Sequence, residues 1–239
     1  MGQGVKISVY GSFKTRLTEN GGIVNFKAVL FDLDGTLVDS LADLGDATNL
    51  VLERLGLPRH PPDAYRFFVG EGIRVLATRA LPETLRNEET IERCTRAVIE
   101  AYDQRLLAKT RLYGGMADLL DGLQAAGLTL AVLSNKLDGQ TRRIAESLLA
   151  PWSFAKVVGH RPPMPKKPDP TAALQIAKEL GLLPADFLYL GDTAIDMRTA
   201  GAAGMFSVGV LWGFRPAEEL IQAGARILLA RPADLLAFV

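Results

Sequence analysis

One short stretch of the chain constrains the fold more than any other. It begins with the apolar run Ala28-Val29-Leu30-Phe31 and continues Asp32-Leu33-Asp34-Gly35. A short apolar run that ends at a glycine turn is typical of a parallel strand covered on both faces. Two carboxylates then follow the strand, where open α/β sheets bind ligands. Because these charges repel, the pair predicts a cation or a proton between them. The alternative is a polar strand-to-helix turn capped by Asp32.

Downstream of this stretch, strand-like apolar runs alternate with helical patterns. This alternation predicts an α/β protein with a doubly wound, Rossmann-like parallel sheet. We expect strands at 128–133, 155–158, 187–190 and 205–210, an edge strand at 226–229, and helices at 116–126, 171–180 and 216–223.

The segment after the first strand has helical patterns only. From residue 41 the apolar residues recur at the spacing of one helix face, and Ser40 with Asp43 has the form of a capping box. We therefore expect an all-helical cap domain at 41–110, inserted into an α/β core formed by 26–40 and 111–239. Residues 1–25, rich in glycine, are expected to form a disordered or loosely attached N-terminal extension.

The composition narrows the range of partners. The 239 residues include 27 Lys and Arg and 27 Asp and Glu, so nothing in the charge balance points to nucleic acid or to an anionic membrane. The sequence contains no apolar run of about 18 residues, so no membrane span is predicted. Cys94 is the only cysteine, which excludes an intramolecular disulfide and fits a reducing compartment. We expect a cytoplasmic monomer or homodimer that binds a small molecule.

Three further polar stretches follow predicted strands or precede a predicted helix. Ser134-Asn135 follows the strand at 128–133, and a small hydroxyl with free backbone N–H groups can bind phosphoryl oxygens. Lys166-Lys167-Pro168-Asp169-Pro170 precedes the helix at 171–180. Gly191-Asp192 follows the strand at 187–190, and Asp196 lies one helical turn further on.

Together these stretches resemble, in the same order, the four signatures of the haloacid dehalogenase-like (HAD) superfamily of phosphatases and phosphomutases. The resemblance implies that Asp32 is the nucleophile, phosphorylated during turnover. It implies that Asp34 is the general acid and base, with its proton affinity raised by neighbouring negative charge. Alignment with the third signature implies that Lys167 stabilises the transferring phosphoryl group, and alignment with the second implies that Ser134 binds the phosphoryl oxygens. Lys166 is interpreted as a solvated neighbour.

The resemblance also implies a magnesium ion, because hard oxygen ligands gather at one place. Its expected ligands are Asp32, the backbone carbonyl of Asp34, and Asp192, with Asp196 in a supporting role. Gly35, Thr36 and Asn135 are expected to shape the loops that hold the phosphate.

One segment of the helical insertion is more specific. Val69-Gly70-Glu71-Gly72-Ile73-Arg74 places two glycines around a carboxylate and resembles the cap loop of the phosphoglycolate phosphatase-like branch. We predict that Glu71 and Arg74 contribute to substrate choice, Arg74 by pairing with a substrate carboxylate. The alternative is an ordinary turn between helices.

The resemblance implies a magnesium-dependent phosphatase for a small phosphate monoester, with 2-phosphoglycolate as the first choice of substrate. Three alternatives stay open. The chain can be a phosphomutase similar to β-phosphoglucomutase, a pyrophosphatase, or a regulator that binds a phosphorylated ligand without catalysis. A shared core does not settle the substrate.

Overall fold

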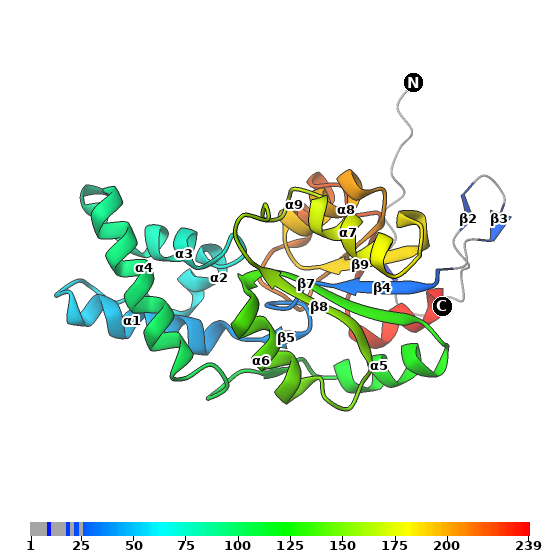
Figure 1. Cartoon of the computed structure of the whole chain (residues 1–239), viewed down its shortest axis with the longest axis horizontal. Helices are drawn as coiled ribbons and strands as arrows, with labels where there is room; N and C mark the ends of the chain where they lie inside the picture. Colours follow the sequence, from blue (N-terminus) through cyan, green and yellow to red (C-terminus); the bar gives the residue numbers. More distant parts are fainter. Residues whose placement is uncertain (1–8, 11–17, 20–21, 24–25) are drawn as a thin grey trace, which may run out of the picture.

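The computed structural model describes residues 9–10, 18–19, 22–23 and 26–239. The described chain forms one sheet of seven strands, and every neighbouring pair in it is parallel. This confirms the predicted doubly wound α/β fold (Figure 1). In spatial order the strands are β1 (Val9–Tyr10), β11 (Ile227–Leu229), β10 (Phe206–Val210), β9 (Phe187–Gly191), β4 (Ala28–Phe31), β7 (Thr129–Leu137) and β8 (Phe154–His160).

Strand β4 occupies the middle of this sheet, and all four of its residues are buried. The strands that follow β4 in the sequence lie on both of its sides. Strands β7 and β8 lie on one side, and β9, β10 and β11 lie on the other. The chain therefore changes direction across the sheet at β4. Ligand sites of open α/β sheets lie at such a switch point, beyond the carboxyl ends of the strands.

Helices cover both faces of the sheet, which explains why β4 is apolar throughout. Ala28 and Leu30 pack with α7 and α8, whereas Val29 and Phe31 belong to the larger core that includes α5 and α6 (Figure 1). The covering helices are α5 (Met116–Ala125), α6 (Asp138–Leu148), α7 (Thr171–Glu179), α8 (Ala194–Ala203), α9 (Ala217–Gln222) and the 3-10 helix η4 (Pro232–Phe238).

Between β5 (Val38–Asp39) and β6 (Arg111–Leu112) the chain is helical. These two short strands pair antiparallel, so the segment leaves and re-enters the α/β unit at one place. We call the segment 41–110 the helical insertion; it lies at one end of the sheet (Figure 1). It contains α1 (Leu41–Arg54), η1 (Pro62–Ala64), α2 (Tyr65–Phe68), α3 (Ile73–Ala80), η2 (Glu83–Leu85) and α4 (Glu88–Asp103). No helix in the described ranges is both long and apolar enough to cross a membrane.

The capping box expected at the start of α1 is wrong. The Ser40 hydroxyl donates to Asp34 and makes no cap, and buried Asp43 instead accepts from the chain at the other end of the insertion. Asp43 Oδ2 takes the Lys109 N–H at 2.9 Å, and the N–H and hydroxyl of Thr110 at 2.8 Å each. Tertiary hydrogen bonds have thus replaced the local ones, and they fasten the two ends of the insertion together.

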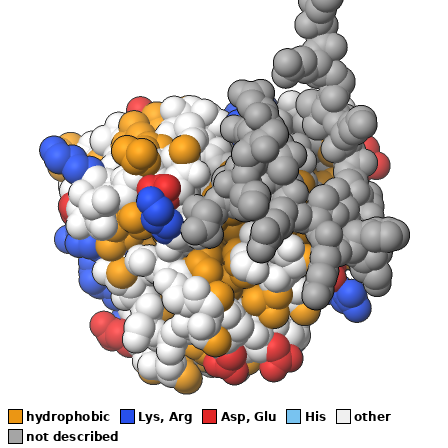
Figure 2. Space-filling model, turned by 90° about the vertical axis from the view of Figure 1, so that its right-hand side faces the viewer, with side chains coloured by type: hydrophobic (Ala, Val, Ile, Leu, Met, Phe, Trp, Pro, Cys, Tyr) orange, Lys and Arg blue, Asp and Glu red, His pale blue; other side chains and the backbone are white. Residues whose placement is uncertain are grey.

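The sheet also extends beyond the predicted strands. Strand β7 continues through Ser134 to Leu137, and β11 is not an edge strand because Val9 and Tyr10 pair with Leu228 and Leu229. In the predicted N-terminal extension, β1 pairs with β11, and β2 (Thr18–Glu19) pairs antiparallel with β3 (Gly22–Ile23). Residues 1–8, 11–17, 20–21 and 24–25 lie outside the described ones. Figure 2 shows acidic and basic side chains interspersed around one face, in keeping with the balanced charge.

Candidate active site

Asp32 is the first residue beyond β4, and its backbone keeps the register of the sheet by donating to Leu190 O at 2.9 Å. The chain then turns at Gly35, which has a φ of 86°. A Cβ atom at this position would lie 2.2 Å from Asp192 Oδ2. Only glycine therefore lets the loop after β4 approach the carboxylate that follows β9. Gly35 is therefore needed for the close approach of this loop to Asp192.

Lys167 joins the carboxylates that follow two different strands. Its Nζ lies 2.8 Å from Asp32 Oδ1, 2.7 Å from Asp196 Oδ1 and 3.0 Å from the carbonyl oxygen of Leu133. Burial alone would lower the pKa of this ammonium, but Asp196 and Asp32 raise it well above its usual value. Lys167 is therefore a charged group with its three donors in use.

Asp32, Asp192 and Asp196 form a buried acidic cluster whose ligand atoms lie within 4.8 Å of one another. Burial, with the Asp196 charge, raises the pKa of Asp32 to about 7 against the opposing effect of Lys167. Burial and the neighbouring Asp32 also raise the pKa of Asp192. Three carboxylates face one ammonium. When all three are ionised, two negative charges are not compensated. A divalent cation fits that deficit and the oxygen donor set.

The hydrogen bonds distinguish the members of this cluster. Asp196 has both oxygens engaged, Oδ1 by Lys167 and Oδ2 by the N–H and hydroxyl of Thr193 at 3.2 and 2.8 Å. Asp192 Oδ2 accepts the N–H of Phe214 at 2.8 Å, and the Thr36 hydroxyl lies 3.5 Å from Oδ1. Asp192 keeps more acceptor capacity than Asp196, which favours Asp192 as a ligand and Asp196 as a support for Lys167.

Asp34 contacts a lysine that the sequence did not predict. Its Oδ2 lies 2.9 Å from Nζ of Lys136, and its Oδ1 accepts from the Ser40 hydroxyl. Lys136 Nζ also lies 3.0 Å from the hydroxyl of Tyr102, on α4 of the insertion. Asp34 is thus in contact with a cation and a hydroxyl, and its charge also interacts with the nearby carboxylate of Asp32.

The C-terminal part of β7 brings two predicted residues to the site. Ser134 lines the cavity described below, and its hydroxyl accepts from the N–H of Lys136 at 3.2 Å. Asn135 Oδ1 accepts the Lys167 N–H at 2.9 Å, and its Nδ2 donates to Lys167 O at 3.1 Å and to Gly70 O at 3.2 Å. Asn135 therefore fastens both the Lys167 loop and the insertion to β7. The phosphate-binding roles of Ser134 and Asn135 stay predictions.

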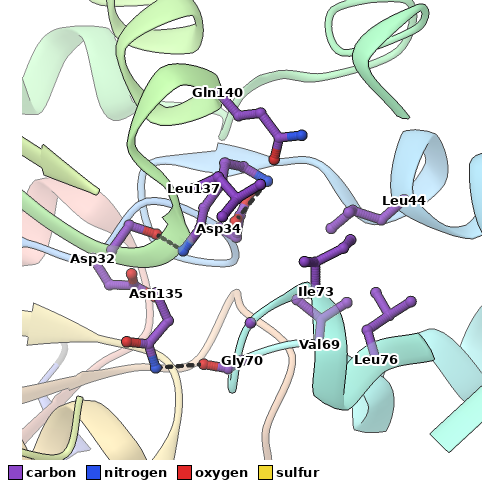
Figure 3. Close-up of a pocket in the computed structure, with 13 residues that line it drawn as sticks. Asp32, Asp34, Leu44, Val69, Gly70, Ile73, Leu76, Asn135, Leu137 and Gln140 are labelled. Carbon is purple, nitrogen blue, oxygen red and sulfur yellow. Dashed lines mark hydrogen bonds and ion pairs between the residues drawn. The ribbon is translucent and has the colours of Figure 1, made fainter. Parts of the chain in front are cut away.

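A small cavity of about 40 Å³ lies between the strand ends and the insertion (Figure 3). On the sheet side it is lined by Asp32, Asp34 and the segment 134–137, with Gln140 beside them. The insertion contributes apolar side chains and two glycines. In Figure 3 the apolar groups lie opposite Asp34, and they are Leu44, Val69, Ile73 and Leu76.

The two predicted substrate-selecting residues do not line this cavity. Glu71 is ion-paired with Arg79. Arg74 Nη2 lies 2.6 Å from Glu88 Oε2 and Nη1 lies 3.2 Å from Glu92 Oε2, on α4. Both side chains have partners within the insertion, so their part in substrate choice stays a prediction.

Three residues at or near the site were not predicted from the sequence, and they are Lys136, Tyr102 and Arg215. Lys136 was visible as a charged residue directly after Ser134-Asn135, whereas nothing local marked Tyr102. Arg215 donates to the carbonyl oxygens of Arg66 and Val69, the latter at 2.9 Å, and so connects the loop after β10 to the insertion.

Comparison with known proteins agrees with this geometry. The family model described as haloacid dehalogenase-like hydrolase matches residues 29–210. The chain therefore belongs to the haloacid dehalogenase-like hydrolase family.

Within that family the chain falls in the phosphoglycolate phosphatase-like branch. It is 36% identical over 214 residues to a phosphoglycolate phosphatase of Chromobacterium violaceum, covering 88% of this chain and 95% of the relative. The phosphoglycolate phosphatase of Aquifex aeolicus is 33% identical over 210 residues, with the same two coverages. The crystal structure of a predicted phosphoglycolate phosphatase from Haemophilus somnus superposes with a TM-score of 0.82 at 29% identity, covering 90% of this chain and 98% of that one.

Proposed function

We propose that the chain is a magnesium-dependent phosphatase that hydrolyses a small phosphate monoester, 2-phosphoglycolate first among candidates, through a phosphorylated Asp32. The observation that carries this proposal is Asp32 at the end of β4, 2.8 Å from a buried lysine and within 4.8 Å of two further carboxylates. The names of the relatives support the choice of substrate.

The proposed reaction has two steps. Lys167 contacts Asp32 Oδ1, which leaves Oδ2 to attack phosphorus. The Oδ2–P bond forms as the ester P–O bond breaks, and Asp34 gives a proton to the departing alcohol. The oxygen of a water molecule then attacks phosphorus as the Oδ2–P bond breaks, Asp34 accepts the water proton, and inorganic phosphate leaves. The Asp32 carboxylate is restored.

Asp32, Asp192 and the backbone carbonyl of Asp34 would hold the magnesium ion. Bound there, the ion supplies positive charge to the transferring phosphoryl group. Lys167 holds Asp32 in position and offsets the charge between two anions. Thr193 and Lys167 fix Asp196, and Phe214 fixes Asp192.

We assign the helical insertion, residues 41–110, the role of a cap domain over the core of 26–40 and 111–239. The cavity wall that it supplies is apolar, and closing such a wall over the site excludes bulk water while Asp32 is phosphorylated. A small phosphorylated metabolite in the cytoplasm is the proposed partner.

Phosphate release from a panel of esters tests the proposal. The panel contains 2-phosphoglycolate, hexose phosphates, nucleoside monophosphates and pyrophosphate, each with magnesium and with a chelator. We expect metal-dependent release that is fastest with 2-phosphoglycolate. Asp32→Asn should abolish release, whereas Asp118→Asn, at an exposed position on α5, should not.

The other functions give different results in the same panel. A phosphomutase converts a hexose phosphate into its isomer with little free phosphate, and a pyrophosphatase prefers pyrophosphate. A regulator binds a phosphorylated ligand and turns over none. Release by Asp32→Asn at the parental rate would contradict the mechanism.

A further inference from the structure

Lys136 has donor capacity that its hydrogen bonds to the described residues do not use. Its side chain is 4% exposed, and its Nζ contacts Asp34 Oδ2 at 2.9 Å and the Tyr102 hydroxyl at 3.0 Å. An ammonium has three N–H donors, so these two contacts leave one. Lys136 lines the cavity, and that donor is available to a ligand there.

The surrounding charges single out this lysine. Of the described residues that line the cavity, Lys136 alone carries a positive charge. Lys167 spends its donors on Asp32, Asp196 and the Leu133 carbonyl, and Arg74 is paired with two glutamates on α4. Burial would lower the pKa of Lys136, but Asp34 and Tyr102 raise it, so the ammonium stays charged.

We propose that Lys136 binds a second anionic group of the substrate, a carboxylate on the carbon next to the ester oxygen, and thereby selects phosphorylated hydroxy acids. This inference rests on the proposed phosphatase function. The substrate carboxylate accepts the remaining N–H of Lys136, while Asp34 and Tyr102 continue to accept the other two. Because Tyr102 belongs to α4, the helical insertion holds Lys136 in place and contributes to selection without a charge of its own at the cavity.

A pair of substrates isolates this contact. Ethyl phosphate has a methyl group where 2-phosphoglycolate has its carboxylate, and both place the same phosphate before Asp32 and Asp34. The selectivity is the ratio of kcat/KM for 2-phosphoglycolate to kcat/KM for ethyl phosphate. Lys136→Gln also disturbs Asp34, but that effect acts on both substrates and cancels in the ratio.

We expect Lys136→Gln to lower the selectivity about ten- to a hundredfold, through a higher KM for 2-phosphoglycolate, as befits the loss of a charged hydrogen bond. Lys178→Gln, at an exposed position on α7, is the matched control and should keep the parental ratio. Tyr102→Phe keeps the charge and loses only the hydroxyl that positions it. It should lower the selectivity several-fold, and it serves as the test if Lys136→Gln does not fold.

The outcomes separate the two proposals. Unchanged selectivity in folded Lys136→Gln, or in Tyr102→Phe if the first variant does not fold, overturns the assignment of Lys136. A loss of selectivity in Arg74→Gln but not in Lys136→Gln overturns it as well and returns the role to Arg74. A parent enzyme that hydrolyses both esters without preference instead refutes 2-phosphoglycolate as the substrate. No turnover of either ester refutes the phosphatase function itself.

Discussion

The protonation of Asp32 makes the metal-free protein sensitive to pH. Its pKa is about 7 in the folded chain against an ordinary value of 3.8. Below about pH 4 both the folded and the unfolded chain hold this proton. Between the two pKa values the unfolded chain has lost the proton and the folded chain keeps it. The free energy of unfolding therefore falls as the pH rises through this window.

The size of the effect follows from the difference between the two pKa values. Each pKa unit corresponds to about 1.36 kcal/mol, so a rise from 3.8 to about 7 corresponds to about 4 kcal/mol. Asp192 acts in the same direction because its pKa is also raised. His160 acts in the opposite direction, since burial lowers its pKa. A comparison with Asp32→Asn removes the contributions that both proteins share.

The assay is urea unfolding in the presence of a chelator at several pH values between about 4 and about 8. We expect the parent to lose about 4 kcal/mol relative to Asp32→Asn across this range. Magnesium should reduce the loss, because the ion favours the ionised carboxylates. A difference between the two proteins that is constant, or that grows in favour of the parent as the pH rises, would refute the reasoning.

Three other substitutions test separate parts of the structure. Lys167→Ala should reduce the rate of phosphate release in steady-state assays by about a hundred- to a thousandfold, because a donor that stabilises charge is lost. A parental rate would shift the role to Lys166. Asp43→Ala should lower the free energy of unfolding by about 2–4 kcal/mol, because three hydrogen bonds from Lys109 and Thr110 are lost. Urea titration measures this free energy, and a change below about 0.5 kcal/mol would contradict the prediction. Arg215→Ala should lower kcat/KM about tenfold by weakening contact with the insertion, whereas Arg198→Ala, at an exposed position, should not; equal kinetics in the two variants would argue against that contact.

The sequence predicted best where local pattern and sheet topology agree. Each predicted catalytic carboxylate followed an apolar run, and parallel strands bring such residues to one edge of the sheet. Asp32 and Asp192 therefore meet as expected, although 160 positions separate them in the numbering. The register before Pro168 also selected Lys167 over Lys166, and Lys167 is the lysine that touches Asp32.

The sequence predicted least where the partner of a polar side chain comes from another element. Ser40 and Asp43 matched a local capping pattern, but Asp34 and Thr110 took their hydrogen bonds. Arg74 pairs with α4, which sequence spacing did not reveal. Such partners depend on how the insertion docks against the sheet, and local periodicity carries no information about docking.

The loop after β10 touches the acidic cluster and the insertion at the same time. Phe214 donates its N–H to Asp192, and the next residue, Arg215, donates to carbonyl oxygens of the insertion. If a cation binds the acidic cluster and the helical insertion moves as a cap, these two adjacent residues link cation affinity to cap position. If a bound ion favours the closed position of the insertion, that closed position must raise the affinity for the ion by the same factor. On that condition, the affinity for the ion is lowest while the insertion is open to substrate.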